Sequence, residues 1–396
     1  MSDIDIEALR ANTPGCAHRN HLNNAGAALL SATTISAMAD YLEREALIGG
    51  YEAAEEATAQ IGDVYASLAE LIGASPEQIA LFDNSTHAWN AAFYSVPLRA
   101  GDRILTGRSE YGSSVLAYLQ TAQRTGAEIV VVPNDDSGQI DLDALVTLID
   151  ERTKLIGLTW VPTSGGLVNP AAEVGRLARA ADVLYLLDAT QTVGQFPIDV
   201  TAVGCDMLTG TGRKFLRGPR GTGFLYVADR ALDRLDPVVA EIHSATWDGG
   251  RSFTWAGGAR RFESWENSYI NVIGLGSAVR QALDIGLEPI GRRSAALGAR
   301  LRAGLAQIDG VSVHDLGRRQ CAIVTARVAG VATAAVADEL SRHGINVTTT
   351  VAEHNQFDSE VRDVHPMVRL SPHYYNTEAE IDHAIGVVRA LAANRR

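Results

Sequence analysis

Lys214 is one of only two lysines in the chain, the other being Lys154, and arginine supplies the remaining side chains of this charge. It stands in "TGTGRKFLRGPRGTGFLYV", between small residues and an apolar run. A lysine amine can lose its proton through burial or a nearby cation and then attack a carbonyl, which arginine cannot do. The alternative interpretation is a surface lysine in a glycine-rich turn, so the rest of the chain has to decide.

An acid and two hydroxyl groups follow other apolar runs. Asp188 ends the run 183–187, where a carboxylate is costly unless a cation meets it. Ser85 and Thr86 stand at a predicted helix start, where hydroxyls and free backbone N–H groups can bind an anion. Each of the three could instead be a simple helix cap.

Tyr111 comes soon after the predicted strand residues 104–109. Thr211, Arg213 and Lys214 come after 206–210. Together these positions offer an anion cradle, a flat aromatic ring, a buried acid and an amine. Pyridoxal phosphate has a phosphate, a planar ring, a pyridine nitrogen that must stay protonated and an aldehyde that reacts with amines. We therefore predict that this cofactor is bound here, with Lys214 as its covalent anchor and Asp188 as the partner of its ring nitrogen.

The elements that would position these residues alternate between strands and helices. Strands are predicted from seven apolar runs, at 78–84, 103–110, 128–134, 155–162, 183–190, 206–212 and 221–227. Helical spacing of apolar residues occurs between them, at 85–98, 112–126, 141–153 and 170–181. This alternation predicts an α/β fold with a mostly parallel seven-stranded sheet covered on both faces. Ligands of such sheets bind at the carboxyl ends of the strands.

The pattern changes near residue 275. Long helices are predicted over 273–308, followed by a strand–helix–strand–strand–helix order up to residue 394. We expect an N-terminal arm over 1–20, a large cofactor-binding domain over 21–275 and a small C-terminal α+β domain over 276–396, with the N-terminal segment packing on the small domain.

Composition excludes several classes of protein. The chain has 396 residues and a net charge of −13, which argues against nucleic acid or an anionic membrane as a partner. No run reaches the roughly 18 apolar residues of a membrane span, and the N-terminus does not resemble a signal peptide. The three cysteines are odd in number and widely spaced, which indicates reduced thiols and a cytoplasmic protein. They are Cys16, Cys205 and Cys321.

No metal site is expected. The stretch "EHNQFDSEVRDVH" contains several possible ligands, but no short metal-binding motif, and we interpret it as a polar loop near the active site. The possible ligands in it are His354, Asp358, Glu360, Asp363 and His365. A protein that only binds the cofactor or only dimerises is the non-enzymatic alternative. Lys214, Asp188 and Arg369 together favour an enzyme.

From His21 to Asp382 the chain resembles the class V, fold-type-I pyridoxal-phosphate enzymes, which include cysteine desulfurases, isopenicillin N epimerase-like proteins and kynureninases. The motifs that carry the resemblance are "TGRKFLRGPRGTGFLYV", "LLDATQTVGQFPIDV", "NSTHA" and "VRLSPHYYN". The resemblance implies that Thr211 and Arg213 touch the cofactor phosphate and that Gln191 bonds the ring hydroxyl. It also implies a phosphate turn at Ser85 and Thr86, although Asn84 replaces the family's glycine.

The resemblance also implies substrate contacts. Arg369 matches the arginine that grips the α-carboxylate, and Tyr111 stands where desulfurases carry a stacking histidine. Asn24, Tyr51 and Tyr374 are the further candidates for substrate binding.

One departure from the desulfurases bears on function. Their reactive cysteine lies shortly before this arginine, but the corresponding stretch here, 347–369, has none. The chain is similar to the hercynylcysteine sulfoxide lyases of ergothioneine synthesis, through "GGYEAAEEA" among other motifs, and to the enzymes that process S-cysteinyl intermediates in lincosamide antibiotic pathways. These resemblances imply a carbon–sulfur β-lyase of specialised thiol or antibiotic biosynthesis that acts on an S-substituted L-cysteine. Decarboxylation with oxidative deamination, and amino-acid epimerisation, remain as alternatives.

The charged stretch "RRFESWENS", 260–268, has two interpretations. It could be a solvated loop. In the family that the chain resembles, it reaches across a dimer interface to the neighbour's cofactor phosphate, which implies a homodimer with shared sites.

Overall fold

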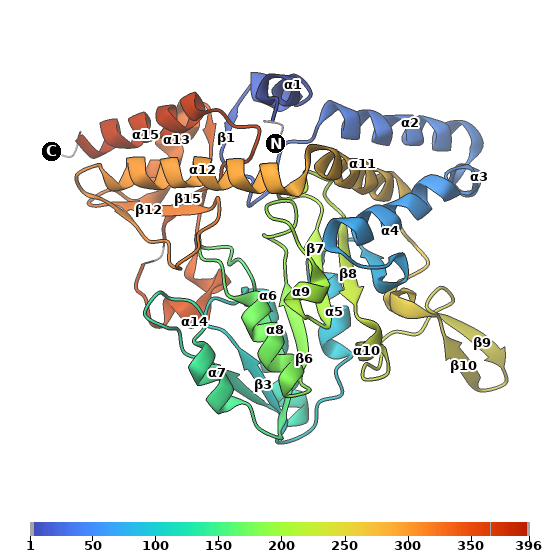
Figure 1. Cartoon of the computed structure of the whole chain (residues 1–396). Coiled ribbons are helices and arrows are strands. Elements are labelled where there is room, and N and C mark those ends of the chain that lie inside the picture. The colour runs from blue at the N-terminus through green and yellow to red at the C-terminus, as the bar shows by residue number, and fades with distance from the viewer. Residues whose placement is uncertain (1–3, 365, 394–396) are drawn as a thin grey trace.

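The computed structural model describes residues 4–364 and 366–393 (Figure 1). All seven predicted strands form one sheet in the order β2-β8-β7-β6-β5-β3-β4. Strand β8 is antiparallel to both of its neighbours, and the pairs among β3 to β7 are parallel. The strands are β2 (Ile79–Phe82), β3 (Arg103–Thr106), β4 (Glu128–Val131), β5 (Thr153–Thr159), β6 (Leu184–Asp188), β7 (Met207–Thr211) and β8 (Gly223–Val227).

Both faces of this sheet are buried, which explains the continuous apolar runs. In β6, Tyr185 and Leu187 join a core that includes side chains of α4 (Thr58–Ile72), α8 (Ala171–Ala180) and α11 (Tyr269–Ile285). Leu184 and Leu186 point the other way, into a core with α5 and α6. The helices that follow these strands are α5 (Ser85–Tyr94), α6 (Gly112–Thr125), α7 (Leu142–Leu148), α8 (Ala171–Ala180), α9 (Val200–Val203) and α10 (Asp229–Leu232).

The C-terminal part forms a second sheet, in the order β11-β12-β15-β14, in which all neighbouring strands are antiparallel. Helices flank this sheet (Figure 1). Its own apolar core includes Leu297, Leu301 and Ile385, which belong to these helices. The elements here are α12 (Leu287–Ala306), β11 (Val311–Val313), β12 (Val324–Val328), α13 (Thr333–Arg342), β13 (Ile345–Asn346), β14 (Thr348–Thr349), η4 (Ala352–His354), α14 (Gln356–Ser359), β15 (Val368–Leu370) and α15 (Glu378–Ala393).

The N-terminal segment pairs with this second part, because β1 (Asn20–His21) lies parallel to β13. The segment begins with α1 (Ile6–Ala11) and η1 (Pro14–Ala17), and continues after β1 into α2 (Ala32–Ile48), α3 (Gly50–Glu56), α4 (Thr58–Ile72) and η2 (Pro76–Gln78). The predicted boundary at 275 falls inside α11 (Tyr269–Ile285), whose Leu275 and Val279 pack in the core of the large sheet. We propose that the division comes at Gly286, between α11 and α12.

A hairpin that the apolar pattern did not predict projects from the large domain. It consists of β9 (Ala245–Gly249) and β10 (Ser252–Trp255), and η3 (Gly258–Phe262) follows it (Figure 1). Within the described residues, no helix combines the length and the apolar character that a membrane crossing needs.

Candidate active site

A pocket lies where the loops after β2, β3, β5, β6 and β7 meet. All eight residues that we predicted to hold the cofactor line it. They are Ser85, Thr86, Tyr111, Asp188, Gln191, Thr211, Arg213 and Lys214. These side chains are brought together because strands β3, β5, β6 and β7 run in the same direction, so that the loops after them meet at one edge of the sheet. Their individual roles remain predictions.

Lys214 is buried in the turn after β7, with 7% of its surface exposed. Burial, followed by the charges of Arg213 and Arg369, lowers the pKa of its amine to about 7, while Asp188 acts in the opposite direction. The amine makes no hydrogen bond or ion pair with any residue in 4–364 and 366–393. A large share of this lysine is therefore neutral at physiological pH, as a nucleophile or base requires.

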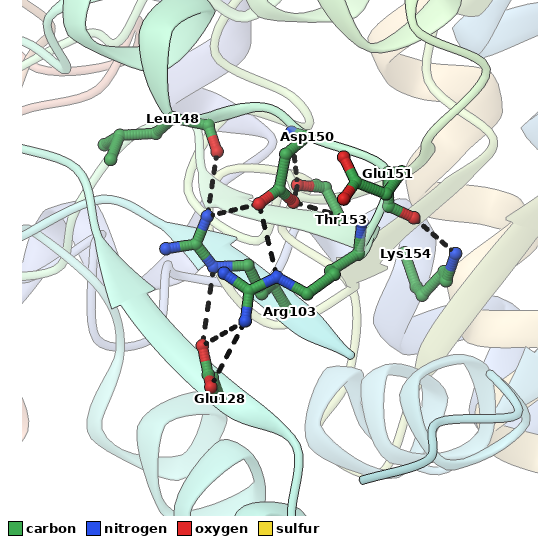
Figure 2. A network of polar contacts seen from close by, with 8 residues as sticks. Arg103, Glu128, Leu148, Asp150, Glu151, Thr153 and Lys154 are labelled. Atoms are coloured by element: carbon green, nitrogen blue, oxygen red, sulfur yellow. Dashed lines mark hydrogen bonds and ion pairs between the residues drawn. The ribbon is translucent and has the colours of Figure 1, made fainter. Parts of the chain in front are cut away.

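Lys154 has a different environment. It is the second residue of β5, at the end of the strand opposite to the pocket, is exposed, and donates from Nζ to the carbonyl oxygen of Glu151 at 2.7 Å. Figure 2 shows it beside a network in which Arg103 binds Asp150 at 2.8 Å. Of the two lysines, Lys214 alone lines the pocket.

Asp188 is the last residue of β6 and is 8% exposed. Its Oδ1 accepts from the backbone N–H of Thr190 at 2.8 Å, which fixes the carboxylate at the strand end. The Thr190 hydroxyl in turn hydrogen-bonds Ser85 Oγ at 2.5 Å. Thr190 lines the pocket and was not predicted, although its position after a strand could have indicated it.

The start of α5 forms one wall of the pocket. Asn84 caps the helix, and its Oδ1 accepts from the backbone N–H of His87 at 2.8 Å. Gly223 of β8 must be glycine, because a Cβ there would lie 2.4 Å from the carbonyl carbon of Asn84. The first N–H groups of a helix have no partner within it, so those of Ser85 and Thr86 are suited to a phosphate.

Gln191 provides a test of whether the cofactor fits. Its Nε2 donates to the carbonyl oxygen of Ala25 at 3.1 Å and to Thr163 Oγ1 at 3.3 Å. Its Oε1 is buried and has no hydrogen-bond partner among the described residues. Because buried acceptors are normally satisfied, this oxygen suits the hydroxyl group of a pyridoxal ring. Together with the amine, the acid and the anion site, it makes the pocket fit pyridoxal phosphate.

Thr211 and Arg213, which we expected at the phosphate, also bond within the chain. Thr211 donates to the carbonyl oxygen of Thr222 at 2.9 Å, and Arg213 donates to that of Gly26. Both still line the pocket, so a phosphate would meet a hydroxyl and a guanidinium there.

A second buried acid lies behind the pocket and was not predicted. Glu110 is 3% exposed, and its two carboxylate oxygens accept from the backbone N–H of Thr159 at 2.9 Å and from the Thr159 hydroxyl at 2.7 Å. Burial raises the pKa of Glu110 to about 7, and the nearby Asp188 acts in the same direction. This carboxyl ties the end of β5 to the loop that carries Tyr111.

Arg369 of β15 reaches the pocket wall and is 7% exposed. Its Nη1 donates to the carbonyl oxygen and to the hydroxyl of Thr163, both at 2.9 Å, and its Nη2 donates to Asn23 Oδ1 at 3.3 Å. Its Nε is buried without a partner among the described residues. Burial and the charge of Arg213 lower the pKa of Arg369 to about 10. Thr163 and Asn23 were not predicted; Thr163 could have been found from its place after β5.

None of the four predicted substrate residues lines the pocket itself, although Arg369 bonds Thr163, which does line it. Asn24 is fully buried, donates to the carbonyl oxygen of Ser371 at 2.7 Å and accepts from the Tyr375 hydroxyl. The Tyr374 hydroxyl accepts from Arg217 at 2.6 Å. Tyr51 is 77% exposed and lines a separate groove with Trp265.

The stretch 260–268 folds back on its own chain at its start. Arg260 stacks over the ring of Tyr65, with its guanidinium carbon 3.2 Å from the ring centroid. Glu263 accepts from the backbone N–H of Leu81 at 2.6 Å and bonds His243 at 2.9 Å. Residues 264–268 line the groove that Tyr51 also lines.

The loop before β15 lies beside the pocket. The rings of His354 and Tyr111 are 6.4 Å apart, and a Cβ on Gly112 would lie 2.7 Å from the carbonyl oxygen of Glu353. Across residues 4–364 and 366–393, no three His, Cys, Asp or Glu side chains are arranged to hold a metal ion. His365, the last member of the predicted polar loop, lies outside the described residues.

All three cysteines lie in the described part of the chain, and none lines the pocket. Cys205 and Cys321 are buried. Burial raises the pKa of Cys321 to about 12 and that of Cys205 further. Burial also raises the pKa of Cys16, which is half-buried. The thiolate form that sulfur chemistry needs is therefore disfavoured at all three positions.

Comparison with known proteins identifies the family and the fold of the chain. The family described as aminotransferase class-V matches residues 20–383. A probable cysteine desulfurase of Synechocystis sp. is 30% identical over 84% of this chain and 81% of its own length, and one of Xylella fastidiosa is 31% identical over 84% and 80%. A cysteine desulfurase from Thermococcus onnurineus NA1 superposes with a TM-score of 0.91 at 24% identity, covering 99% of this chain and 100% of its own. The cystine C-S lyase C-DES superposes with 0.86 at 23% identity, over 95% and 99%. These structures confirm the predicted fold.

Proposed function

Because the chain belongs to the aminotransferase class-V family, whose cofactor is pyridoxal phosphate, we propose that it is a pyridoxal-phosphate-dependent carbon–sulfur β-lyase. The predicted cofactor is confirmed by the family. The proposed substrate is an S-substituted L-cysteine, either a thioether or a sulfoxide conjugate. The curated relatives named above are probable cysteine desulfurases, and C-DES is a cystine C-S lyase, so the names of all three refer to the sulfur of cysteine or cystine. None of these names points to a pathway, so the proposal concerns the reaction alone.

One observation favours a lyase over a desulfurase: the pocket that contains Lys214 has no cysteine in its lining. A desulfurase needs a reactive thiolate that accepts sulfur, and the thiols of this chain lie outside the pocket with raised pKa values. A β-lyase needs no such thiol, because the sulfur leaves with its own substituent. For a thioether, R–S–CH₂–CH(NH₃⁺)–COO⁻ and water give RSH, pyruvate and ammonium. The Cα–H, Cβ–S and Cα–N bonds break, water supplies the ketone oxygen of pyruvate, and no oxidant or reductant is required.

Arg369 is suited to hold the substrate carboxylate. Both N–H donors of Nη1 bond Thr163. The N–H of Nε and one N–H of Nη2 have no acceptor among the described residues. Nε and Nη2 share one edge of the guanidinium plane, and such an edge binds a carboxylate through two parallel hydrogen bonds. A carboxylate held in this way orients the Cα–H bond of the substrate toward the amine.

Lys214 is suited to move the α-proton. Its pKa of about 7 lies near physiological pH, where a general base is most effective. Bound pyridoxal phosphate supplies an electron sink for the carbanion. Asp188 holds a proton at the ring nitrogen, and burial of the carboxylate at the end of β6 strengthens that interaction. Tyr111 offers a flat face for the ring.

The products test the proposal. The holoenzyme is incubated with an S-alkyl-L-cysteine sulfoxide, with a bulky S-cysteinyl conjugate and with L-cysteine, and pyruvate, free sulfur product and carbon dioxide are measured. We expect pyruvate and the sulfur product in equal amounts from at least one conjugate. Carbon dioxide without pyruvate would instead indicate decarboxylation, and alanine from L-cysteine would indicate a desulfurase. Deuterium wash-in at the α-carbon with no other product would indicate an epimerase. The Lys214→Ala variant should lose this turnover. Lys154→Ala, which changes the other lysine, is its matched control.

We also propose that the chain works as a homodimer through the groove of about 1030 Å³ that Tyr51 and Trp265 line. Both side chains are more than half exposed, as are Val238 and Val239 on the same groove. Exposed apolar side chains gathered around one groove are typical of an interface. Light scattering should give a dimer mass, and Trp265→Glu should lower it toward the monomer. A fully active wild-type monomer at micromolar concentration would contradict the proposal.

A further inference from the structure

Arg217 has an unusual backbone conformation for an arginine. Its φ is +61°, and Asp182 is the one other described non-glycine residue with a positive φ. A bulky side chain rarely adopts this region, and it persists there where the surroundings impose it. The backbone N–H of Arg217 donates to the carbonyl oxygen of Lys214 at 2.9 Å, so the strained residue closes the turn that holds the lysine.

The Arg217 side chain is held from both ends of the chain. Nη2 donates to Thr13 Oγ1 at 2.6 Å and Nε donates to the carbonyl oxygen of Leu29 at 2.9 Å, both in the N-terminal segment. Nη1 donates to the Tyr374 hydroxyl at 2.6 Å, and the guanidinium carbon lies 4.6 Å from the ring centroid of Tyr375. We call Arg217 with Thr13, Leu29, Tyr374 and Tyr375 the Arg217 clamp.

The contacts of the clamp are directional. Arg217 is 3% exposed, and each of its hydrogen-bond acceptors among the described residues is a neutral oxygen. A buried cation without a carboxylate is expensive, so charge neutralisation does not explain why an arginine stands here. Its planar fork can reach three acceptors at fixed angles, which a lysine cannot do. The stacked ring of Tyr375 adds a favourable contact.

We propose that Arg217 is a positioning residue for Lys214, which holds the lysine turn in place by fastening it to the N-terminal segment and to the small domain. This inference rests on the proposed role of Lys214. The same small-domain segment also holds the next residue of the turn, because His373 Nε2 lies 2.8 Å from the carbonyl oxygen of Phe215, to which it donates. The "SPHYYN" motif after Arg369 thus joins the carboxylate-binding arginine to the lysine turn.

The apoprotein offers a direct measurement. Trace acetylation with acetic anhydride between pH 6 and pH 10, followed by mass spectrometry of peptides, gives the pH midpoint of each amine. Because the chain has two lysines, exposed Lys154 serves as an internal reference in every sample. This readout needs neither cofactor nor turnover.

Three variants separate the parts of the clamp. Arg217→Ala removes the fork and strains the backbone, whereas Arg217→Gly removes the fork but relieves the strain. Thr13→Val with Tyr374→Phe removes two acceptors and leaves the turn sequence intact. We expect all three to move the Lys214 midpoint upward by about one unit, because a loosened turn lets water reach the amine. That shift means about five-fold less neutral amine at pH 7.

Glu380→Ala is the matched control. It removes the Arg10–Glu380 ion pair at 3.0 Å, which also joins the N-terminal segment to the C-terminal part of the chain. It leaves the three acceptors of Arg217 unchanged. We expect no shift of the Lys214 midpoint in this variant. An unchanged midpoint in the Thr13→Val, Tyr374→Phe protein or in Arg217→Gly would overturn the proposal, as would an equal shift in Glu380→Ala. The role of Lys214 is tested separately, since borohydride reduction of the wild-type holoenzyme must leave the cofactor on Lys214 and not on Lys154.

Discussion

The buried amine of Lys214 should make the stability of the apoprotein depend on pH. Burial lowers its pKa from 10.5 to about 7, whereas in the unfolded chain it titrates at about 10.4. Between these values the unfolded chain binds more protons than the folded one, so the lysine destabilises the fold at low pH and the penalty fades as pH rises. A shift of roughly 3 units corresponds to roughly 4 kcal/mol at 1.36 kcal/mol per unit.

Lys214→Met removes the titrating group and keeps a side chain of similar length. We expect the apo variant to exceed the wild type in free energy of unfolding by roughly 4 kcal/mol at pH 7. The difference should shrink as pH rises toward about 10.4 and vanish above it, because the wild-type lysine is then neutral in the unfolded chain as well as in the folded one. Urea denaturation at pH 7, 8, 9 and 10, at one protein concentration, gives the difference at each pH.

Lys154→Met is the control, because this exposed lysine should contribute little to the free energy of unfolding. A difference for Lys214→Met that stays constant from pH 7 to pH 10 would refute a lowered amine pKa. It would also remove the basis for Lys214 as a base at neutral pH.

Three other outcomes follow from the site. Asp188→Asn should keep the fold and bind the cofactor but slow turnover by about 10²–10⁴-fold, measured as kcat; near-normal turnover would remove the ring-nitrogen role. Arg369→Lys should raise KM for the amino-acid substrate far more than it lowers the cofactor content, because an ammonium cannot offer two parallel donors; an unchanged KM would place the carboxylate elsewhere. A variant with all three cysteines changed to alanine should stay active if it folds, and loss of activity in a folded, cofactor-bound protein would revive a desulfurase. The changed positions are Cys16, Cys205 and Cys321.

The sequence predicted the large sheet well because both of its faces are buried. Each strand then appears as an unbroken apolar run, and the residues just after the runs form the pocket. Lys214 and Asp188 could be found in this way because burying a charged side chain costs free energy. Such a residue next to a buried strand therefore indicates a functional role. The hairpin β9–β10 escaped prediction because most of its residues are exposed, so no apolar alternation marks it.

Contacts between distant segments could not be predicted from pattern. Asn23 and Asn24 are neighbours in the sequence, yet Asn23 hydrogen-bonds Arg369, whereas Asn24 hydrogen-bonds Ser371 and Tyr375. Both asparagines lie just after the two-residue strand β1, which is too short to show a period in the sequence. The acid Glu110 was missed for a related reason, since its partner Thr159 is 49 residues away.

The Arg217 clamp also sets an order of events during synthesis. Tyr374 lies 157 residues after Arg217, and Thr13 lies 204 residues before it. At about 5–20 residues per second, a ribosome needs on the order of 8 to 30 seconds to make the chain between Arg217 and Tyr374. During that interval the large sheet can assemble, but the lysine turn lacks its C-terminal anchor. A nascent chain stalled before Tyr374 should therefore take up cofactor poorly, so that loading of the enzyme comes after translation is nearly complete.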